Sequence, residues 1–314
     1  MKIKKSIYIL AVGALFVSCN DLDVDDNVDF NVSLAPENTY KAGEPVVFNF
    51  DGNPDYITWW SGEEGHVYAN RERTELPLEE IESVTLSFEA QARYGKVTNT
   101  LSLFVSDDFP GLSKDAATDK ARVADFETNA TSLSSNGELL ESKFANRTAT
   151  SFDLTPYSAS EMTLAFHYKA DFDGKNSLKR WDFYSVAITT VYKNGNTTTL
   201  GVADLGLMAF DCNPNTDPQH AQHGDPYFDN SSGSGSCSGV WDLRSSLTRV
   251  NSFTYLGGGP SETYTNDADD WLFTKALKLN TCDPDENSGV LKNINVRLPS
   301  YSYVYTEPGT YTVT

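Results

Sequence analysis

Short runs of alternating apolar and polar residues recur along most of this 314-residue chain. Val28, Phe30, Val32 and Leu34 are separated by single polar residues, which is the period of a strand with one buried face. Turn-forming residues separate such runs, and the Asn-Gly pair at residues 194–195 is a strong hairpin signal. Aromatic residues make up 12% of the chain, and no long amphipathic helix is evident. The sequence therefore predicts an all-β fold.

The spacing of these runs predicts how the chain divides into domains. Several short strands within residues 28–108 are typical of an immunoglobulin-like sandwich. The pattern fades over residues 109–136, which predicts a connection with a single helical turn. Strands return in residues 137–314 with long loops between them, the longest at 211–240, and this favours a larger jelly-roll, galactose-binding-like sandwich. Alternation still runs at Thr314, so we expect the last strand to be clipped.

The N-terminus has the pattern of an export signal. Three lysines within the first five residues precede an apolar run at residues 7–17, which ends at Ser18 and Cys19. A basic start, a short apolar run and a small residue before a cysteine are typical of a signal peptide with a lipobox. The run is too short to span a membrane as a stable helix. We therefore expect a signal peptide over residues 1–19 and a lipid on Cys19; an ordinary secretory signal is the alternative.

Negative charge dominates the chain and begins directly after this signal. Residues 20–27 contain four aspartates, and such a self-repelling run predicts an extended tether, with a plain solvated linker as the alternative. The whole chain has 44 acidic against 24 basic residues and a net charge of −20. This charge disfavours nucleic acid and anionic lipid as partners, so membrane contact is expected through the lipid anchor only.

One motif and the acidic run carry a resemblance to a known family. The motif is Gly-Asn-Pro-Asp-Tyr-Ile-Thr-Trp-Trp-Ser-Gly-Glu at residues 52–63, followed by Gly65, His66, Tyr68, Asn70, Arg71 and Arg73. It resembles the signature of a family of Bacteroidota outer-membrane lipoproteins of uncharacterised function. These have an N-terminal domain of the immunoglobulin or polycystic-kidney-disease type and accompany SusC/SusD-type glycan uptake systems. Residues 301–314 likewise resemble the closing hairpin of polycystic-kidney-disease-type domains.

The resemblance implies a location and partners. The protein would be lipid-anchored in the outer membrane, would face the cell exterior, and would serve a SusC/SusD-type transporter complex.

Exposed aromatic rings beside polar groups are the candidate sugar-binding residues, because a pyranose has an apolar face and a rim of hydroxyls. Trp59 and Trp60 are adjacent in an expected strand, so one faces the core and the other outward. Trp60 is a candidate, although packing over the next loop is the favoured role of the outward ring. Trp241 and Tyr227 border the long loop and are the other predicted ligand-binding residues. The remaining aromatics considered are Trp181, Tyr184, Tyr255, Tyr264 and Trp271.

The three cysteines after Cys19 lie in an exported protein, where disulfides persist. Cys212 and Cys237 flank a polar segment rich in Pro and Gly, which predicts a disulfide that closes this loop. Cys282 is then left over, and the sequence leaves open whether it is buried or reactive.

The sequence predicts no cofactor and no metal site, and leaves a structural calcium ion open. Two clusters carry oxygen ligands of the kind that calcium takes, although ordinary turns explain both: Asp171, Asp173, Asn176 and Asp283, Asp285, Glu286, Asn287. His220 and His223, near Asp217 and Asp225, have the spacing of zinc ligands but lie in a Gly- and Pro-rich loop.

No catalytic constellation emerges either. Residues 235–239 have the spacing of a nucleophile elbow with Cys237 as nucleophile, but no buried parallel strand leads into them. A pair of glycosidase carboxylates is neither supported nor excluded among 44 acids. We therefore expect a cell-surface lipoprotein that binds polysaccharide or oligosaccharide without catalysis. The alternatives are a structural or adhesive lipoprotein that binds protein partners and, third, a glycoside hydrolase accessory.

Overall fold

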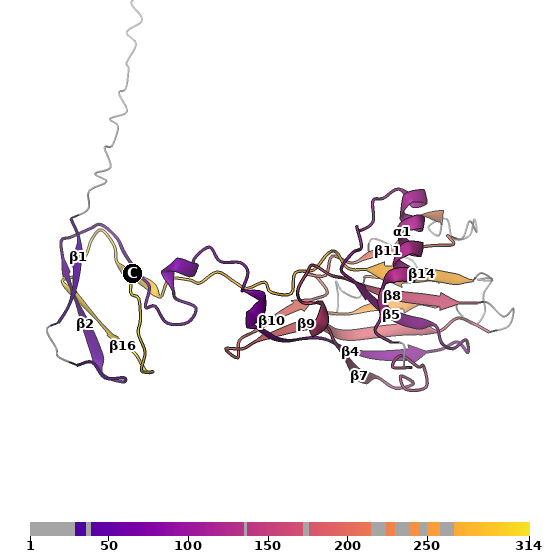
Figure 1. The fold of residues 1–314 in the computed structure, drawn as a ribbon, viewed down its shortest axis with the longest axis horizontal. Coiled ribbons are helices and arrows are strands. Elements are labelled where there is room, and N and C mark those ends of the chain that lie inside the picture. Colours follow the sequence, from indigo (N-terminus) through magenta and orange to yellow (C-terminus); the bar gives the residue numbers. More distant parts are fainter. Residues whose placement is uncertain are drawn as a thin grey trace, which may run out of the picture. The chain divides into compact units, whose positions relative to one another are not determined.

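The computed structural model describes residues 29–35, 39–134, 137–171, 176–214, 224–229, 231, 239–244, 250–257 and 267–314. These residues are almost entirely β, with one α-helix among them, so the all-β prediction is confirmed (Figure 1). None of the described helices is long and apolar enough to cross a membrane. The chain forms two compact units: the smaller contains the residues up to Glu72 together with Pro284–Thr314, and the larger contains Arg73–Asp283.

This division differs from the expected domains at 28–108 and 137–314. The strands β4 (Ile81–Arg93) and β5 (Leu101–Ser106) belong to the larger unit, whereas the last 31 residues of the chain belong to the smaller one. The physical reason is strand pairing. Alternation along a segment shows that it forms a half-buried strand, but does not show which distant strand supplies its hydrogen bonds.

The smaller unit consists of two small sheets. One has the order β1-β2-β16 and the other pairs β15 with β3. Between them lies a core of Val46, Phe48, Trp59 and Tyr305. The chain end also pairs here, because the backbone N–H of Trp60 donates to the Thr314 carbonyl at 2.9 Å. The strands are β1 (Asn31–Leu34), β2 (Pro45–Asp51), β3 (Ile57–Trp59), β15 (Gly289–Lys292) and β16 (Ser300–Val304), and the short helix η1 spans Tyr68–Asn70.

The larger unit is a sandwich of two sheets. One has the order β12-β13-β9-β4-β7 with β10 also on β9, and the other has the order β11-β14-β8-β5-β6. The first sheet contains β4, β7 (Thr148–Asp153), β9 (Arg180–Tyr192), β10 (Thr197–Gly201), β12 (Val240–Asp242) and β13 (Phe253–Leu256). The second contains β5, β6 (Thr131–Ser132), β8 (Thr163–Ala170), β11 (Met208–Asp211) and β14 (Ala268–Phe273). The short helices η2 (Leu78–Glu80) and η3 (Thr155–Tyr157) flank the first sheet.

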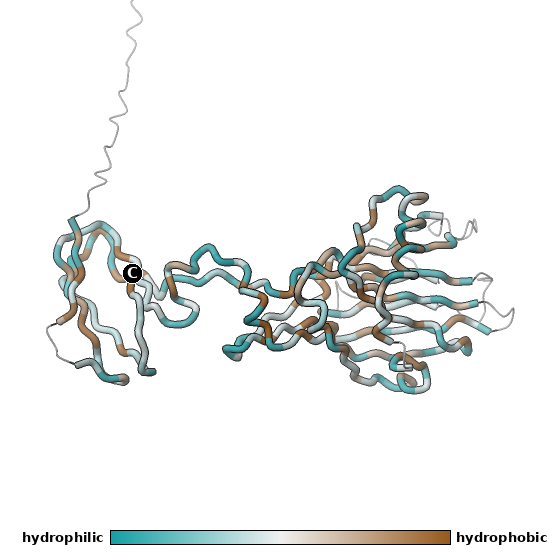
Figure 2. The backbone as a smooth tube through the Cα atoms, in the orientation of Figure 1, coloured by the Kyte–Doolittle hydropathy of each residue, from teal (hydrophilic) through white to brown (hydrophobic). Residues whose placement is uncertain are grey.

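Strand β4 shows how the sequence builds this sandwich. Its apolar residues Val84, Leu86 and Phe88 are buried in the main core, while the intervening residues face outward. Figure 2 shows hydrophobic and hydrophilic stretches alternating along the chain. Because side chains alternate across a strand, the polar half of β4 must form part of the outer face of the six-stranded sheet.

The helix α1 (Ala116–Asn129) covers the outer face of the five-stranded sheet only. Its start is fixed by Asp115, whose carboxylate accepts a hydrogen bond from the Thr118 N–H at 2.9 Å. Val123 and Phe126 pack against Trp271 and other rings of that face. The expectation of a single helical turn within 109–136 was therefore wrong. Among the described residues, no helix covers the outer face of the six-stranded sheet.

Candidate functional site

Trp241 was predicted to lie on the binding surface, and this prediction was wrong. Its side chain is only 1% exposed and packs in the main core, with its ring 5.1 Å from that of Tyr255 and 6.0 Å from that of Phe253. Proximity to the long loop was the reason for choosing it. The pairing of β12 with β13 instead turns this ring inward.

Tyr227 is half-buried and holds helix α1 in place. Its hydroxyl donates to the buried carboxylate of Asp119 at 2.7 Å, and the Lys114 ammonium lies 4.6 Å from its ring centre. It packs against Phe210 rather than in the cluster that contains Trp241. The structure therefore does not bring the two predicted residues together.

Trp60 remains at the surface of the smaller unit. It is half-buried and meets the exposed ring of Tyr68 edge-on at 5.4 Å, while the Arg71 guanidinium covers Tyr68 at 4.2 Å. Trp59 is buried in the core of this unit. This arrangement agrees with the alternation expected for adjacent strand residues, and it shows Trp60 packing toward the following loop.

The other predicted sites lie wholly or partly outside the described residues. This holds for Cys19, Cys237, Asp173, His220 and His223. Cys212 is a free cysteine, and burial raises the pKa of its thiol to about 12. Because Cys237 lies outside the described residues, the disulfide between the two stays a prediction. In the second oxygen-rich cluster, Asp285 accepts hydrogen bonds from Val67 and Asn70 and so supports the chain itself. No group of three potential metal ligands forms within the described ranges.

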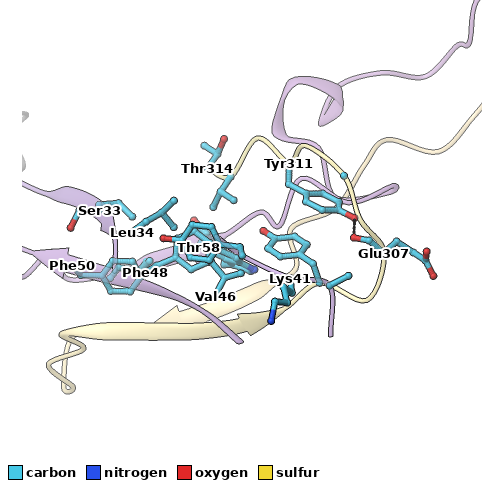
Figure 3. Close-up of a pocket in the computed structure, with 18 of the residues that line it drawn as sticks. Ser33, Leu34, Lys41, Val46, Phe48, Phe50, Thr58, Glu307, Tyr311 and Thr314 are labelled. Atoms are coloured by element: carbon cyan, nitrogen blue, oxygen red, sulfur yellow. Dashed lines mark hydrogen bonds between the residues drawn. The ribbon is translucent and has the colours of Figure 1, made fainter. Parts of the chain in front are cut away.

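An apolar groove of about 650 Å³ lies in the smaller unit (Figure 3). Its lining comes mainly from aromatic and aliphatic side chains such as Leu34 and Phe48, with Lys41 and Glu307 among the few charged ones. The Tyr311 hydroxyl donates to the Glu307 carbonyl at 2.8 Å across one end. A sugar needs many polar partners for its hydroxyls. The groove therefore suits an apolar ligand better than a glycan.

A different surface gathers polar and aromatic side chains, on the outer face of the six-stranded sheet. Strands β4 and β9 pair there so that Glu89 lies opposite Tyr184, Gln91 opposite Asp182 and Arg93 opposite Arg180. Such opposed positions share one face of a sheet and interact directly. Glu89, Arg93, Tyr94, Arg147, Arg180, Asp182 and Tyr184 together form the arginine–tyrosine patch.

Tyr94 lies in the connection that leads from β4 in one sheet to β5 in the other, and its backbone conformation is unusual. Its φ is +53°, a left-handed value that bulky side chains rarely adopt, and its side chain is 65% exposed. The Lys179 ammonium donates to the Gly95 carbonyl at 2.8 Å and so supports this connection. Backbone strain at an exposed aromatic residue persists only where the surroundings enforce it, and such strain is concentrated at functional sites.

Asp182 anchors two arginines near this connection. The carboxylate is 2% exposed and accepts from Arg180 Nε at 2.8 Å and Nη2 at 2.7 Å, while Arg93 Nη2 lies 2.5 Å from its second oxygen. Thr254 also donates to it at 3.1 Å. Burial alone would lower the pKa of Arg93, but the Asp182 carboxylate raises it above its usual value. The two guanidinium groups are therefore fixed in place by one buried carboxylate.

Arg147 forms the other half of the patch. Its guanidinium lies 4.2 Å from the centre of the half-buried Tyr184 ring and is hydrogen-bonded to Glu89. An arginine stacked on a ring and held by a carboxylate loses little additional side-chain entropy when it binds a ligand. The patch thus combines the exposed ring of Tyr94 with ordered donors and acceptors, which is the chemistry that binds a sugar.

Sequence reasoning found only part of this patch. Tyr184 was among the aromatic residues considered, but Tyr94, Arg93 and Arg147 were not. The Tyr-Gly pair at residues 94–95 was a signal that could have been followed further, because connections between strands lie at the surface. Nothing in the sequence indicates that Arg147 lies beside β4.

Between the two sheets lies a pair of carboxylates that was also not predicted. Asp211 of β11 and Asp270 of β14 are direct partners in the strand register, and the Tyr255 hydroxyl donates to Asp270 at 2.8 Å. Burial raises the pKa of Asp211 to about 6 and that of Asp270 well above its usual value. Because Asp270 is only 4% exposed, this pair is part of the interior rather than a surface that a polymer reaches.

The fold and the patch define an all-β protein with a two-sheet sandwich whose uncovered face carries ordered aromatic and arginine side chains. Residues 18–210 match the model of a domain of unknown function, DUF5017, and this chain belongs to that family. The match contains Trp60 and all seven residues of the arginine–tyrosine patch, but neither Tyr227 nor Trp241. No curated protein and no solved structure matches the chain significantly.

Proposed function

We propose that this protein is a cell-surface lipoprotein that binds glycan without catalysis for a SusC/SusD-type uptake system. The binding surface is the arginine–tyrosine patch. The observation that carries the proposal is the exposed Tyr94 ring, held in a left-handed conformation beside ordered arginines.

The geometry of the patch suits an open surface that captures part of a polymer. The exposed ring of Tyr94 offers an apolar face for stacking, and the ion pairs of the patch offer donors and acceptors for hydroxyls. Stacking and a few hydrogen bonds give only micromolar to millimolar affinity, roughly −4 to −8 kcal/mol. Weak binding suits a protein that must release its ligand to a transporter.

The described carboxylates of the patch favour binding over hydrolysis. Glu89 is hydrogen-bonded to Arg147, and Asp182 is shared by Arg93 and Arg180. A glycosidase needs one carboxylic acid to deliver a proton and a second carboxylate to act as base or nucleophile. Carboxylates held by arginines are instead suited to orienting those arginines.

We expect Tyr94→Gly to weaken glycan binding about tenfold, since the loss of one stacked ring is worth on the order of 1.4 kcal/mol. The same change should leave the free energy of unfolding unchanged or raise it by about 0.5–1 kcal/mol, because glycine adopts a positive φ without strain. A glycan array identifies the ligand, and calorimetry with purified variants then measures affinity.

The matched control is Tyr56→Ala, which removes an equally exposed ring, at 67%, from the smaller unit. It should bind glycan as the wild type does. If Tyr94→Gly bound the glycan as tightly as the wild type does, the arginine–tyrosine patch would not be the binding surface. Failure of the wild type to bind any glycan would favour the adhesive alternative.

The location is tested separately through Cys19. We expect Cys19→Ala to be unlipidated and released from the membrane fraction, because the thioether link would be lost. Protease added to intact cells should digest the wild-type protein. Protection of the wild type until the outer membrane is broken would contradict a cell-surface location while leaving glycan binding intact.

A further inference from the structure

The arginine–tyrosine patch is locally basic on a strongly acidic protein. Among the described residues, its three arginines pair with two carboxylates, those of Glu89 and Asp182, whereas the whole chain has a net charge of −20. Lys96, Lys143 and Lys179 lie in the segments that adjoin it. A local excess of fixed positive charge attracts anions over about one Debye length, roughly 8 Å at physiological salt.

The excess comes from Arg93 and Arg180, which share one buried anion. Arg180 uses Nε and Nη2 for Asp182, and Arg93 uses Nη2. The Nε of Arg93 is buried without an acceptor among the described residues. The side chains are 35% and 34% exposed, so solvent reaches both guanidinium groups. The part of each guanidinium group that does not face Asp182 is therefore within reach of a ligand.

We infer that the glycan bound at this patch carries isolated carboxylates, as a uronic acid among neutral sugars does, and that Arg93 and Arg180 bind the carboxylate. The inference rests on the proposed function and adds the class of ligand. A planar guanidinium matches a carboxylate in bidentate geometry, and such charge-assisted bonds are about twice as strong as neutral ones.

The charge of the chain limits how acidic this glycan is. One ligand carboxylate balances the single excess charge of the patch. A densely charged polymer would meet the rest of a −20 chain and be repelled. The patch therefore selects sparse carboxylates rather than a continuous polyanion.

The test compares ligands first, so that it does not depend on any variant. A panel of oligosaccharides with one uronic acid each is measured by calorimetry beside the same sugars after reduction of the carboxyl to an alcohol, and beside sulfated counterparts. Reduction should weaken binding to the wild-type protein about tenfold or more. Raising the salt concentration should weaken binding of the acid but not of the reduced sugar.

The variant Arg180→Gln should bind the acid and the reduced sugar equally, and Arg93→Gln should do the same. The matched control is Arg122→Gln on α1, because Arg122 is 32% exposed and also pairs with a buried carboxylate, that of Asp119. It should retain the full preference for the acid. Thermal unfolding of each variant shows whether it is folded.

The outcomes separate this inference from the proposed function. The inference is overturned if the wild type binds the acidic and the reduced sugars equally, or if it prefers the sulfated or densely charged ones. Neither result contradicts the proposal that the protein binds glycan. Binding of no sugar, acidic or neutral, overturns both.

Discussion

Trp241→Ala should lower the free energy of unfolding of the larger unit by about 3–5 kcal/mol, the range found when a buried aromatic ring is truncated to alanine. Trp241 is 1% exposed and packs against Phe253, Tyr255 and Phe166. Removing the indole forfeits its hydrophobic transfer free energy and leaves a cavity that close-packed neighbours fill only in part. Denaturant unfolding followed by circular dichroism measures the change.

Two further variants make this result specific. The indole N–H of Trp241 is buried without a partner among the described residues, so Trp241→Phe removes an unsatisfied donor and should be far less destabilising than Trp241→Ala. Tyr94→Gly, at the surface of the same unit, should not be destabilising. A loss below about 1 kcal/mol in Trp241→Ala would contradict the burial of this ring.

The second large effect concerns pH. Between about pH 4 and pH 7, the Asp211–Asp270 pair should make the free energy of unfolding fall as pH rises, by about 1–3 kcal/mol. Burial raises the pKa of Asp211 to about 6, and burial next to Asp211 raises the pKa of Asp270 well above its usual value. The native protein therefore holds protons that the unfolded chain releases near pH 4. Deprotonation places negative charge between the sheets.

The variant Asp270→Asn should flatten this dependence and should be more stable than the wild type at pH 7, because an amide resembles the protonated carboxyl in size and carries no charge. Asp108→Asn, at an exposed position, should keep the wild-type slope. Measurements are kept above pH 4 because Asp119 has the opposite effect on the free energy of unfolding at lower pH. Burial alone would raise the pKa of Asp119, but hydrogen bonds from Ser113 and Tyr227 lower it. If Asp270→Asn showed the same pH dependence of the free energy of unfolding as the wild type, the Asp211–Asp270 pair would not be the source of that dependence.

The contrast between Trp60 and Trp241 shows what kind of prediction a sequence supports. For adjacent residues of one strand, alternation correctly places one ring in the core and one at the surface. For Trp241 the argument was its closeness to a long loop, and closeness along the chain does not determine which face a short strand buries. The pairing of β12 with β13 determines that the Trp241 ring faces the core.

The candidate site was less accessible to sequence reasoning than the fold. Tyr184 was among the aromatic residues considered from the sequence, but Tyr94 was not, and Arg147 reaches the patch only because β7 pairs with β4. The sharing of Asp182 by Arg93 and Arg180 likewise depends on the register of β4 against β9. Register comes from the packing of both strands' apolar faces, and no single segment encodes it.

The sequence by itself determined that this protein is all-β, where most of its strands lie, and which residues of β4 face the core. These properties depend on local alternation and on turn chemistry, which neighbouring residues specify. Only the tertiary structure decided that β4 and β5 join the larger unit, that the C-terminal segment returns to the smaller one, and that arginines from three segments meet around Tyr94 and Tyr184. The reason is that hydrogen bonds between strands and burial in a shared core act between residues far apart in the chain.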